Sequence, residues 1–469
     1  MDTDVVIAGL GPTGAVLAGL LAQWGVRSIA VERDTEVYRL PRAAHFDAEI
    51  MRIFQQLGIA GDLLPHTRSI PHYEFRNAGG EVLMRTEQGA TDGPLGWRNS
   101  YMFHQPAMEE LLRAKLENSP LCEVRLGESI VELERNAPDS VTAWLSSGEA
   151  ISAHYLVGCD GANSTVRKLC DIDLFDFGFD EPWLVLDVLT QAEEKLPQGG
   201  LQLCDPRRPT TVMPMSPGRR RWEFMLLPGE TPEDMLDDAV IARLLEPWLA
   251  RDDAEVVRKA VYRFHGLVAT RWRDGSVLLA GDAAHQMPPF MGQGMCSGIR
   301  DAAALAWRLG MILKHGWGAD ILESYQTERD PHVRTIVAMA IAMGRIVCTT
   351  DPVAAAARDK AMLANGPGQP AGVGGLPPLT GGFLHPSPRA GEVCPPPTIK
   401  GERLDEMSGH GFLLVARESV VVPDHVRFVA AEGLFADWLD RLNVEAVLVR
   451  PDRYIFGTGK AAKLLAALG

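Results

Sequence analysis

Residues 276–301 read SVLLAGDAAHQMPPFMGQGMCSGIRD and contain the pattern from which the fold is inferred. The apolar run SVLLA ends at Gly281-Asp282, as a buried strand does before a sharp turn. Beyond the glycine-rich loop, apolar residues recur at helical spacing, which predicts a helix beginning near Ser297. The N-terminus of such a helix offers unpaired N–H groups and a partial positive charge, and glycines let a flat ligand approach the backbone. The stretch predicts a ligand-binding loop, although an ordinary strand–turn–helix with a capping aspartate would show the same pattern.

A second glycine-rich turn lies near the N-terminus. Residues 3–8 (TDVVIA) are strand-like, and they are followed by GLGPTG, an apolar helical run and a second strand over Ser28–Val31. Glu32 comes next, 18 residues after Gly14. This order is the dinucleotide-binding fingerprint, in which glycines permit a tight turn against a pyrophosphate and an acidic residue meets a ribose hydroxyl. A nucleotide site is therefore predicted, with the following candidate residues: Gly9, Gly11, Thr13, Gly14 and Glu32.

A third motif, HYLVG followed by CDGANSTVR, occupies residues 154–167. In chain order, GxGxxG, DGxxSxVR and GDAAHxxPP with GQGxxxGxRDA resemble the FAD-dependent aromatic hydroxylases of the para-hydroxybenzoate hydroxylase type. Within that superfamily, Pro41–Ile59 and Leu448–Gly459 most resemble the 3-(3-hydroxyphenyl)propionate hydroxylases and the polyketide hydroxylases. The resemblance covers nearly the whole chain.

The resemblance implies that FAD is bound and that NADPH or NADH reduces it as a transient co-substrate. It also implies that O₂ forms a flavin C4a-hydroperoxide, whose distal oxygen hydroxylates a phenolic ring. The implied FAD contacts, besides the N-terminal candidates, are Arg33, Arg42, Gln105, Asp160, Asp282, Pro289, Gly292, Gly294, Met295 and Cys296. The dipole of the helix at Gly294–Cys296 would stabilise negative charge on the reduced flavin. Pro289 is also a catalytic candidate, because the Pro288-Pro289 loop would help exclude water from the reacting edge.

Several of these candidates have a plain structural alternative. Arg42 could be a surface arginine, and Gln105 could cap the helix that follows it. His45, our other catalytic candidate, could be a pocket base that deprotonates a phenol, or merely a loop histidine. Cys296 departs from the family pattern, since many relatives have asparagine there; the change is silent if only its backbone N–H faces the flavin. Arg219–Arg221 is interpreted as a solvated turn, with attraction of an anionic substrate or a pyridine-nucleotide phosphate as the alternative.

Composition limits the classes of partner. The 469 residues include 46 basic and 61 acidic ones, and this net charge of −15 argues against nucleic acid or an anionic membrane surface. Seven cysteines without any Cys-x-x-Cys fit a reducing compartment. Residues 5–26 carry no charge, but the GLGPTG turn interrupts them and argues against a membrane span or signal peptide. We expect a cytoplasmic protein without a membrane partner.

The pattern of elements predicts an α/β fold. A Rossmann-like FAD-binding domain is expected over 1–181 and 269–350, and an inserted antiparallel-sheet substrate domain over 182–268, with an acidic helix over Pro232–Leu249. Residues 366–397 contain nine prolines and eight glycines, which indicates a linker. In the resembled family, residues 398–469 correspond to a thioredoxin-like domain. Because it lacks Cys-x-x-Cys here, we expect it to serve packing or subunit association, with a possible homodimer.

No nucleophile triad or metal site is found in the sequence, so the cofactor must supply the difficult chemistry. The expected function is an NAD(P)H-dependent monooxygenase that uses O₂ to hydroxylate a phenol, with an acidic or extended side chain suggested by the subfamily resemblance. Alternatives are another FAD oxidoreductase of the same fold, such as an epoxidase, dehydrogenase, reductase or halogenase, or a flavin-binding scaffold without activity. The halogenase is disfavoured because the chain has no Trp-x-Trp-x-Ile-Pro motif.

Overall fold

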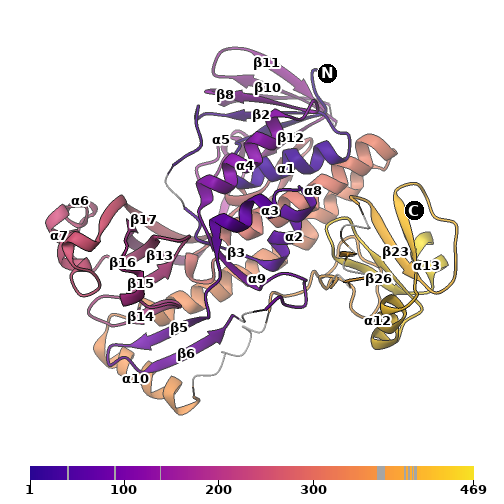
Figure 1. Ribbon diagram of the computed structural model, residues 1–469. Helices are drawn as coiled ribbons and strands as arrows, with labels where there is room; N and C mark the ends of the chain where they lie inside the picture. The colour runs from indigo at the N-terminus through magenta and orange to yellow at the C-terminus, as the bar shows by residue number, and fades with distance from the viewer. Residues whose placement is uncertain are drawn as a thin grey trace.

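The computed structural model describes residues 1–39, 42–88, 91–137, 139–366, 375–395, 398–399, 402–403, 405 and 409–468. Figure 1 shows three sheet regions around a central group of helices. One sheet lies at the N-terminal end, a long-stranded sheet lies to the left of the helices, and a C-terminal sheet lies to their right. Pro41 and parts of the predicted linker, 367–374 and 396–397, lie outside the described residues.

A six-stranded sheet, of order β18-β19-β12-β1-β2-β8, brings the three sequence motifs together. Its strands are β1 (Val5–Ala8), β2 (Ser28–Glu32), β8 (Cys122–Leu126), β12 (Tyr155–Gly158), β18 (Arg273–Asp274) and β19 (Val277–Leu279). All neighbours are parallel except β18 and β19. The carboxyl ends of β1, β12 and β19 are therefore adjacent, and each is followed directly by one of the glycine-containing motifs.

Two helices pack against each other beside this sheet. α1 (Pro12–Gln23) follows the first glycine turn, and α8 (Gly294–His315) follows the third motif. The helix predicted from Ser297 thus begins earlier, because glycines give no apolar periodicity although they adopt helical geometry here. Gly310 permits the close contact, since a Cβ there would lie 2.5 Å from the Trp24 ring.

An eight-stranded sheet, of order β20-β17-β13-β16-β15-β14-β5-β6, forms the second region. Its strands are β5 (His72–Asn77), β6 (Val82–Glu87), β13 (Leu174–Leu189), β14 (Gly200–Cys204), β15 (Thr210–Pro214), β16 (Arg219–Met225), β17 (Glu255–Ala269) and β20 (His285–Gln286). All its pairs are antiparallel except β5 with β14. The expected boundaries at 181/182 and 268/269 fall inside β13 and β17, and the domain division stays a prediction.

One face of this sheet is covered by two short helices, α6 (Pro232–Met235) and α7 (Asp238–Leu245). The prediction of one helix over Pro232–Leu249 is wrong, because Asp237 caps a new helix by accepting hydrogen bonds from the N–H groups of Ala239 and Val240. Trp222 and Phe224 of β16 are buried in a separate core with Ile241 of α7. Alternate residues of the same strand face the opposite side.

A small sheet links these two regions. It contains β3 (His45–Asp47), β4 (Thr67–Arg68) and β7 (Ser100–Phe103), in the order β3-β7-β4. The helices α2 (Ala48–Gln56), α3 (Ala60–Leu63) and α4 (Gln105–Glu117) surround it. A three-stranded sheet of β9 (Ile130–Ala137), β10 (Ser140–Leu145) and β11 (Ala150–Ala153) lies near the N-terminus.

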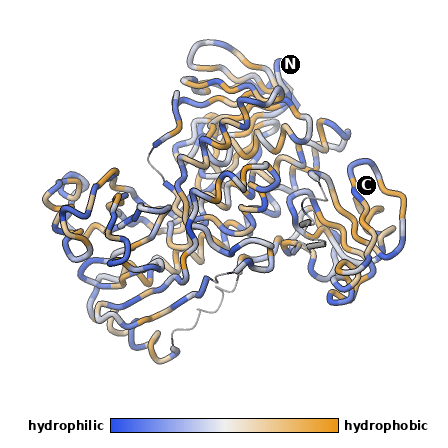
Figure 2. Tube along the Cα trace, viewed as in Figure 1, coloured by the Kyte–Doolittle hydropathy of each residue, from blue (hydrophilic) through white to orange (hydrophobic). Residues whose placement is uncertain are grey.

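The longest helix, α9 (Glu323–Val347), is followed by α10 (Pro352–Ala364). Among the described residues, no single helix is long and apolar enough to cross a membrane. The segments Ala319–Val347 and Pro352–Ala364 meet the length and composition criterion only together, as a pair bent by 113°. Figure 2 shows apolar residues along the central helices and strands and hydrophilic residues on the outer turns.

The C-terminal region contains a four-stranded sheet of order β24-β23-β25-β26. Its elements are β23 (Phe412–Ala416), β24 (Val426–Ala430), α12 (Leu434–Leu442), β25 (Ala446–Val449), β26 (Ile455–Gly459) and α13 (Ala461–Ala466). β23 and β24 are parallel, and the other pairs are antiparallel. Buried polar contacts attach this region to the helices, including Trp307 Nε1 donating to Asp452 at 3.0 Å. The thioredoxin-like assignment stays a prediction.

Candidate active site

A cavity of about 950 Å³ lies between the three motif loops and the eight-stranded sheet. Ten of the sixteen residues predicted to bind cofactor or act in catalysis line it: Gly11, Thr13, Arg42, His45, Gln105, Asp282, Pro289, Gly292, Gly294 and Met295. The other six do not line it: Gly9, Gly14, Glu32, Arg33, Asp160 and Cys296. Residues far apart in the chain therefore meet at one cavity, and the remaining candidates lie behind its surface or beside it.

The N-terminal turn has room only for glycine at two positions. Gly9 has φ +92°, and a Cβ there would lie 2.5 Å from the carbonyl oxygen of Cys159. A Cβ at Gly14 would lie 2.0 Å from the carbonyl oxygen of Gly9. Glu32 supports the turn, because its carboxylate accepts a hydrogen bond of 2.7 Å from the N–H of Leu10. The side chain of Arg33 is 74% exposed and lies 3.8 Å from Asp34, so its role in cofactor binding stays a prediction.

The first and third motifs are in direct contact. Gly281 has φ +62°, and a Cβ there would lie 2.6 Å from Thr13 Oγ1. A Cβ at Gly298 would lie 2.4 Å from the same hydroxyl oxygen. Gly294 and Met295, in the first turn of α8, line the cavity, so the N-terminal N–H groups of a 22-residue helix are close to it. This arrangement suits an anionic ligand group.

The middle motif joins the other two through side chains. Asp160 Oδ1 accepts from Ser164 Oγ at 2.5 Å, and its Oδ2 accepts from the N–H of Val166 at 3.0 Å. The Asp160 carboxylate therefore faces α5 (Thr165–Leu169), while its neighbours Gly161 and Ala162 line the cavity. Arg167 donates to the carbonyl oxygens of Ala283 and Ala162, both at 2.9 Å, and so fixes the third motif against the second.

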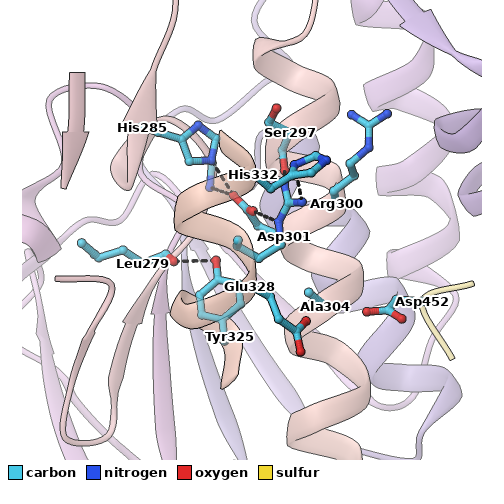
Figure 3. A network of polar contacts seen from close by, with 12 residues as sticks. Leu279, His285, Ser297, Arg300, Asp301, Ala304, Tyr325, Glu328, His332 and Asp452 are labelled. Carbon is cyan, nitrogen blue, oxygen red and sulfur yellow. Dashed lines mark hydrogen bonds and ion pairs between the residues drawn. The ribbon is translucent and has the colours of Figure 1, made fainter. Parts of the chain in front are cut away.

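A buried polar network holds the third motif from behind (Figure 3). His285 is 1% exposed, and its Nε2 lies 2.6 Å from Asp301 Oδ2. Asp301 also accepts from the N–H of Gly281 at 3.0 Å and from Arg329 Nε at 2.9 Å. Burial would raise the pKa of Asp301, but His285 and Arg329 outweigh it and hold the pKa below its usual range. His285 is thus a structural residue that ties the loop to α8 and α9.

The loop after Arg42 forms one side of the cavity. His45 Nδ1 lies 3.3 Å from the carbonyl oxygen of Gly292. A carbonyl only accepts, so this contact assigns the proton to Nδ1 and leaves the Nε2 lone pair available. Burial lowers the pKa of His45, so the ring is neutral at pH 7. The histidine is therefore in the protonation state that a general base requires.

Gln105 is almost fully buried and organises the same loop. Its Oε1 accepts from the N–H groups of Arg42 and Ala43 at 2.8 and 2.7 Å, and its Nε2 donates to Glu109 at 2.7 Å. The capping alternative is wrong, because His104 occupies the N-cap position and no side chain caps this helix. The Arg42 side chain is exposed, with its guanidinium 5.7 Å from the centroid of the Tyr38 ring.

Cys296 is fully buried and does not line the cavity. Its Sγ lies 3.8 Å from the carbonyl oxygen of His45 and 3.6 Å from that of Gly292. Burial raises the pKa of this thiol, which is neutral. The side chain therefore faces the protein interior, and any contact with a ligand in the cavity must come from the backbone.

The polar residues on the sheet side of the cavity were not among the predicted site residues. Arg219–Arg221 begins β16, with Arg220 and Arg221 buried, so its interpretation as a solvated turn is wrong. Arg221 Nε donates to Asp187 Oδ1 at 2.7 Å, and Arg258 Nη1 donates to Asp187 Oδ2 at 3.0 Å. A charge at every second position of an apolar strand, as in Arg221-Trp222-Glu223, is the signal that could have indicated a polar inner face.

A second polar group continues this sheet wall. Gln202 Nε2 donates to Tyr73 Oη at 2.5 Å, and Thr211 Oγ1 donates to Gln202 Oε1 at 2.7 Å. All three residues line the cavity together with Glu223.

No group of three metal-ligating side chains is found in the described part of the chain.

A model of the FAD binding domain matches residues 2–340. A probable NADH-specific resorcinol 4-hydroxylase from Rhodococcus jostii (strain RHA1) is 36% identical over 501 aligned residues, covering 99% of this chain and 93% of that protein. The chain belongs to the FAD-dependent aromatic hydroxylases. This supports the hydroxylase interpretation over the other flavoenzyme classes.

Other comparisons differ in how much of the relative they cover. A 3-(3-hydroxy-phenyl)propionate/3-hydroxycinnamic acid hydroxylase from Mycobacterium sp. (strain JLS) is 38% identical over 362 residues, 76% of this hydroxylase and 63% of that protein. The chain thus spans under two thirds of that relative's length. The crystal structure of aklavinone-11 hydroxylase with FAD and aklavinone has a TM-score of 0.83 at 24% identity, covering 100% of this chain and 98% of that one, which shows a shared fold.

The residues of the hydroxylase fit FAD. One glycine from each motif, Gly11, Gly161 and Gly292, lines the cavity and leaves its surface free of side chains there, and the start of α8 faces it. The cavity volume of about 950 Å³ is at the upper end of the range for ligand sites, about 300–1,000 Å³. The cavity is continuous from the motif loops to the eight-stranded sheet.

Proposed function

We propose that this hydroxylase oxygenates a small phenol of the resorcinol type, with NADH as the reductant. The observation that carries the proposal is the match to the resorcinol relative over 99% of one chain and 93% of the other. The hydroxyphenylpropionate hydroxylases extend well beyond this chain, which covers 62–63% of them.

The chain's part in the reaction begins with binding the cofactor. When bound, FAD supplies the transfer of electrons from NADH and the activation of O₂. The glycine turn before α1 would hold the pyrophosphate of FAD, and the carboxylates of Asp282 and Glu32 would accept hydrogen bonds from the hydroxyl groups of the cofactor. The N–H groups at Gly294 and Met295 stabilise negative charge that develops nearby.

Two residues of the chain act on the substrate side of the cavity. His45, neutral and with Nε2 unprotonated, takes the proton of the phenol and so raises the electron density of the ring. Pro289 begins a short 3-10 helix, Pro289–Met291, that gives the loop a rigid backbone beside the cavity. A rigid, covered loop excludes water, which protects reactive species from hydrolysis.

The test is a panel of phenols given to the purified holoenzyme. Resorcinol, other small phenols, hydroxybenzoates and hydroxyphenylpropionates are compared by substrate-stimulated NADH and NADPH oxidation and by product mass. We expect a yellow protein containing FAD, and a gain of one oxygen on small phenols with NADH preferred. A protein that takes up no FAD, or that oxygenates only non-aromatic compounds, would refute the proposal.

We also propose that the protein works in the cytoplasm as a homodimer. The seven cysteines are all unpaired thiols in the structure, which suits a reducing compartment. Light scattering on the purified holoenzyme tests the dimer. A particle of the single-chain mass, 51.1 kDa, at micromolar concentration would contradict it.

A further inference from the structure

Glu223 is the one acidic side chain in the sheet wall that lacks a partner among the described residues. It is 7% exposed and lines the cavity, and the described part of the chain supplies no hydrogen bond or ion pair to its carboxyl group. In the sheet it pairs with Val185 of β13 and Thr211 of β15, both of which also line the cavity. The side chain therefore points into the cavity with its acceptor oxygens unmatched.

The charges around Glu223 are already balanced. Arg221 and Arg258 are both held by Asp187, at 2.7 and 3.0 Å. These two arginines and the two acids Asp187 and Glu223 form a group without net charge. Burial raises the pKa of Glu223, and the neighbouring Arg221 only partly offsets this. A substrate carboxylate placed here would meet a carboxyl group without gaining an unpaired cation, which is costly in a buried site.

The neighbouring groups match a hydroxyl better than a carboxylate. Tyr262 Oη accepts from Arg258 Nη2 at 2.5 Å, and Tyr73 Oη accepts from Gln202 at 2.5 Å. Within the described residues neither phenol oxygen donates to a protein acceptor, so each keeps a proton to offer. The wall therefore presents hydroxyl donors beside one strong acceptor, Glu223. A phenolic hydroxyl, which both donates and accepts, complements this set.

We propose that Glu223 accepts a hydrogen bond from a hydroxyl on the substrate ring, and that it selects uncharged hydroxylated rings over aromatic carboxylates. The proposal rests on the proposed function. It replaces the expectation from the sequence that the substrate carries an acidic side chain. It makes Glu223 a residue that determines specificity within the aromatic hydroxylase reaction.

Two substitutions separate the acceptor from the charge. Glu223→Met keeps the length and removes the acceptor; a hydrogen bond to a charged group implies a loss in kcat/KM for resorcinol of roughly 10- to 150-fold. Glu223→Gln keeps an acceptor oxygen and removes the charge, so it should retain more activity on resorcinol and gain on 3-(3-hydroxyphenyl)propionate. Glu181→Gln, on β13 and outside the cavity, is the matched control and should keep the wild-type ratio of the two substrates.

The experiment measures kcat/KM for resorcinol and for 3-(3-hydroxyphenyl)propionate on FAD-loaded proteins, with product mass, FAD content and melting temperature. Wild-type preference for the propionate, or an unchanged substrate ratio in both Glu223 variants, would overturn the inference while leaving hydroxylation of phenols intact. If Glu223→Met loses FAD or melts early, the ratio in Glu223→Gln decides. Absence of phenol hydroxylation in the wild type would instead refute the proposed function itself.

Discussion

His45 combines two properties at the scale of the single residue. It lines the cavity, and its Nδ1 faces a carbonyl oxygen, that of Gly292, at 3.3 Å. A Cβ at Gly292 would lie 2.8 Å from His45 Nδ1, so the glycine is required for this contact. The backbone thus fixes the tautomer of the ring, and burial keeps it neutral. The orientation of the ring therefore does not depend on a bound substrate.

We predict that His45→Ala keeps FAD but lowers kcat/KM for a phenol by about 10²–10⁴-fold, the usual contribution of a general base. Because burial lowers the pKa of His45 below 6.5, the wild-type rate should be constant at neutral pH and fall only as the ring gains a proton at lower pH. The variant should lose this acidic limb and oxidise more NADH per product formed. pH-rate profiles with product analysis test this, with His154→Ala, outside the cavity, as control. An unchanged profile and coupling would dismiss the role.

At the scale of the element, the strand–turn–helix of residues 277–315 depends on Asp301. This carboxylate accepts from the N–H of Gly281 at the end of the strand and from Arg329 of α9. It therefore couples the cavity loop to two helices. The low pKa of Asp301 gives the sign of its effect: its contribution to stability is complete above pH 3.8, the ordinary aspartate value, and is lost as pH falls through the lower folded-state pKa.

We predict that Asp301→Asn destabilises the protein by about 3–5 kcal/mol, because Arg329 is left as a buried charge without its partner. FAD affinity should fall with it, since the Gly281 turn loses an anchor. Asp330→Asn is the matched control: Asp330 forms a partly exposed i,i+4 pair with Arg334, and its loss should cost about 0.5 kcal/mol or less. Urea unfolding and FAD titration measure both variants, and equal costs would contradict the prediction.

At the scale of the whole molecule, the C-terminal region reaches the cavity through a chain of hydrogen bonds. Tyr454 Oη donates to Glu49 Oε1 at 2.7 Å, and Arg300 Nε donates to Glu49 Oε2 at 2.7 Å. Arg300 also donates to Asp47 at 2.5 Å. Glu49, Arg300 and Asp47 all line the cavity. The C-terminal region therefore supports residues that line the cavity, in addition to any role between subunits.

We predict that Tyr454→Phe costs about 1–3 kcal/mol, because it leaves a buried Glu49 oxygen without a donor. FAD binding should weaken in the same variant, although Tyr454 does not line the cavity. Tyr155→Phe, in the parallel sheet, is the control: no hydrogen bond of its hydroxyl is found in the described residues, so little should change. Thermal unfolding and FAD titration give both quantities. Full FAD affinity in Tyr454→Phe would show that the C-terminal region is not coupled to the site.

Local patterns in the chain were enough to predict the turns and strands on the motif side of the cavity. Gly9, Gly14 and Gly281 stand where a side chain would meet backbone or a neighbour within 2.6 Å, so the motif carries the geometry in itself. The same holds for the parallel strands β1, β2 and β12, whose apolar runs are short, continuous and followed by turns. Apolar periodicity mispredicted where α8 begins, and it did not show the break between α6 and α7.

The sheet side of the cavity was decided by tertiary structure alone. Arg221 and Glu223 face the cavity because α7 covers the other face of β16, where Trp222 is buried. A strand's alternation does not say which of its faces a distant helix will cover. His285 lies within the third motif, and only the structure shows that it is buried against Asp301, 16 residues further along the chain. Whether a polar side chain faces a cavity or a buried partner depends on residues brought together only by folding, and the choice of substrate depends on those contacts.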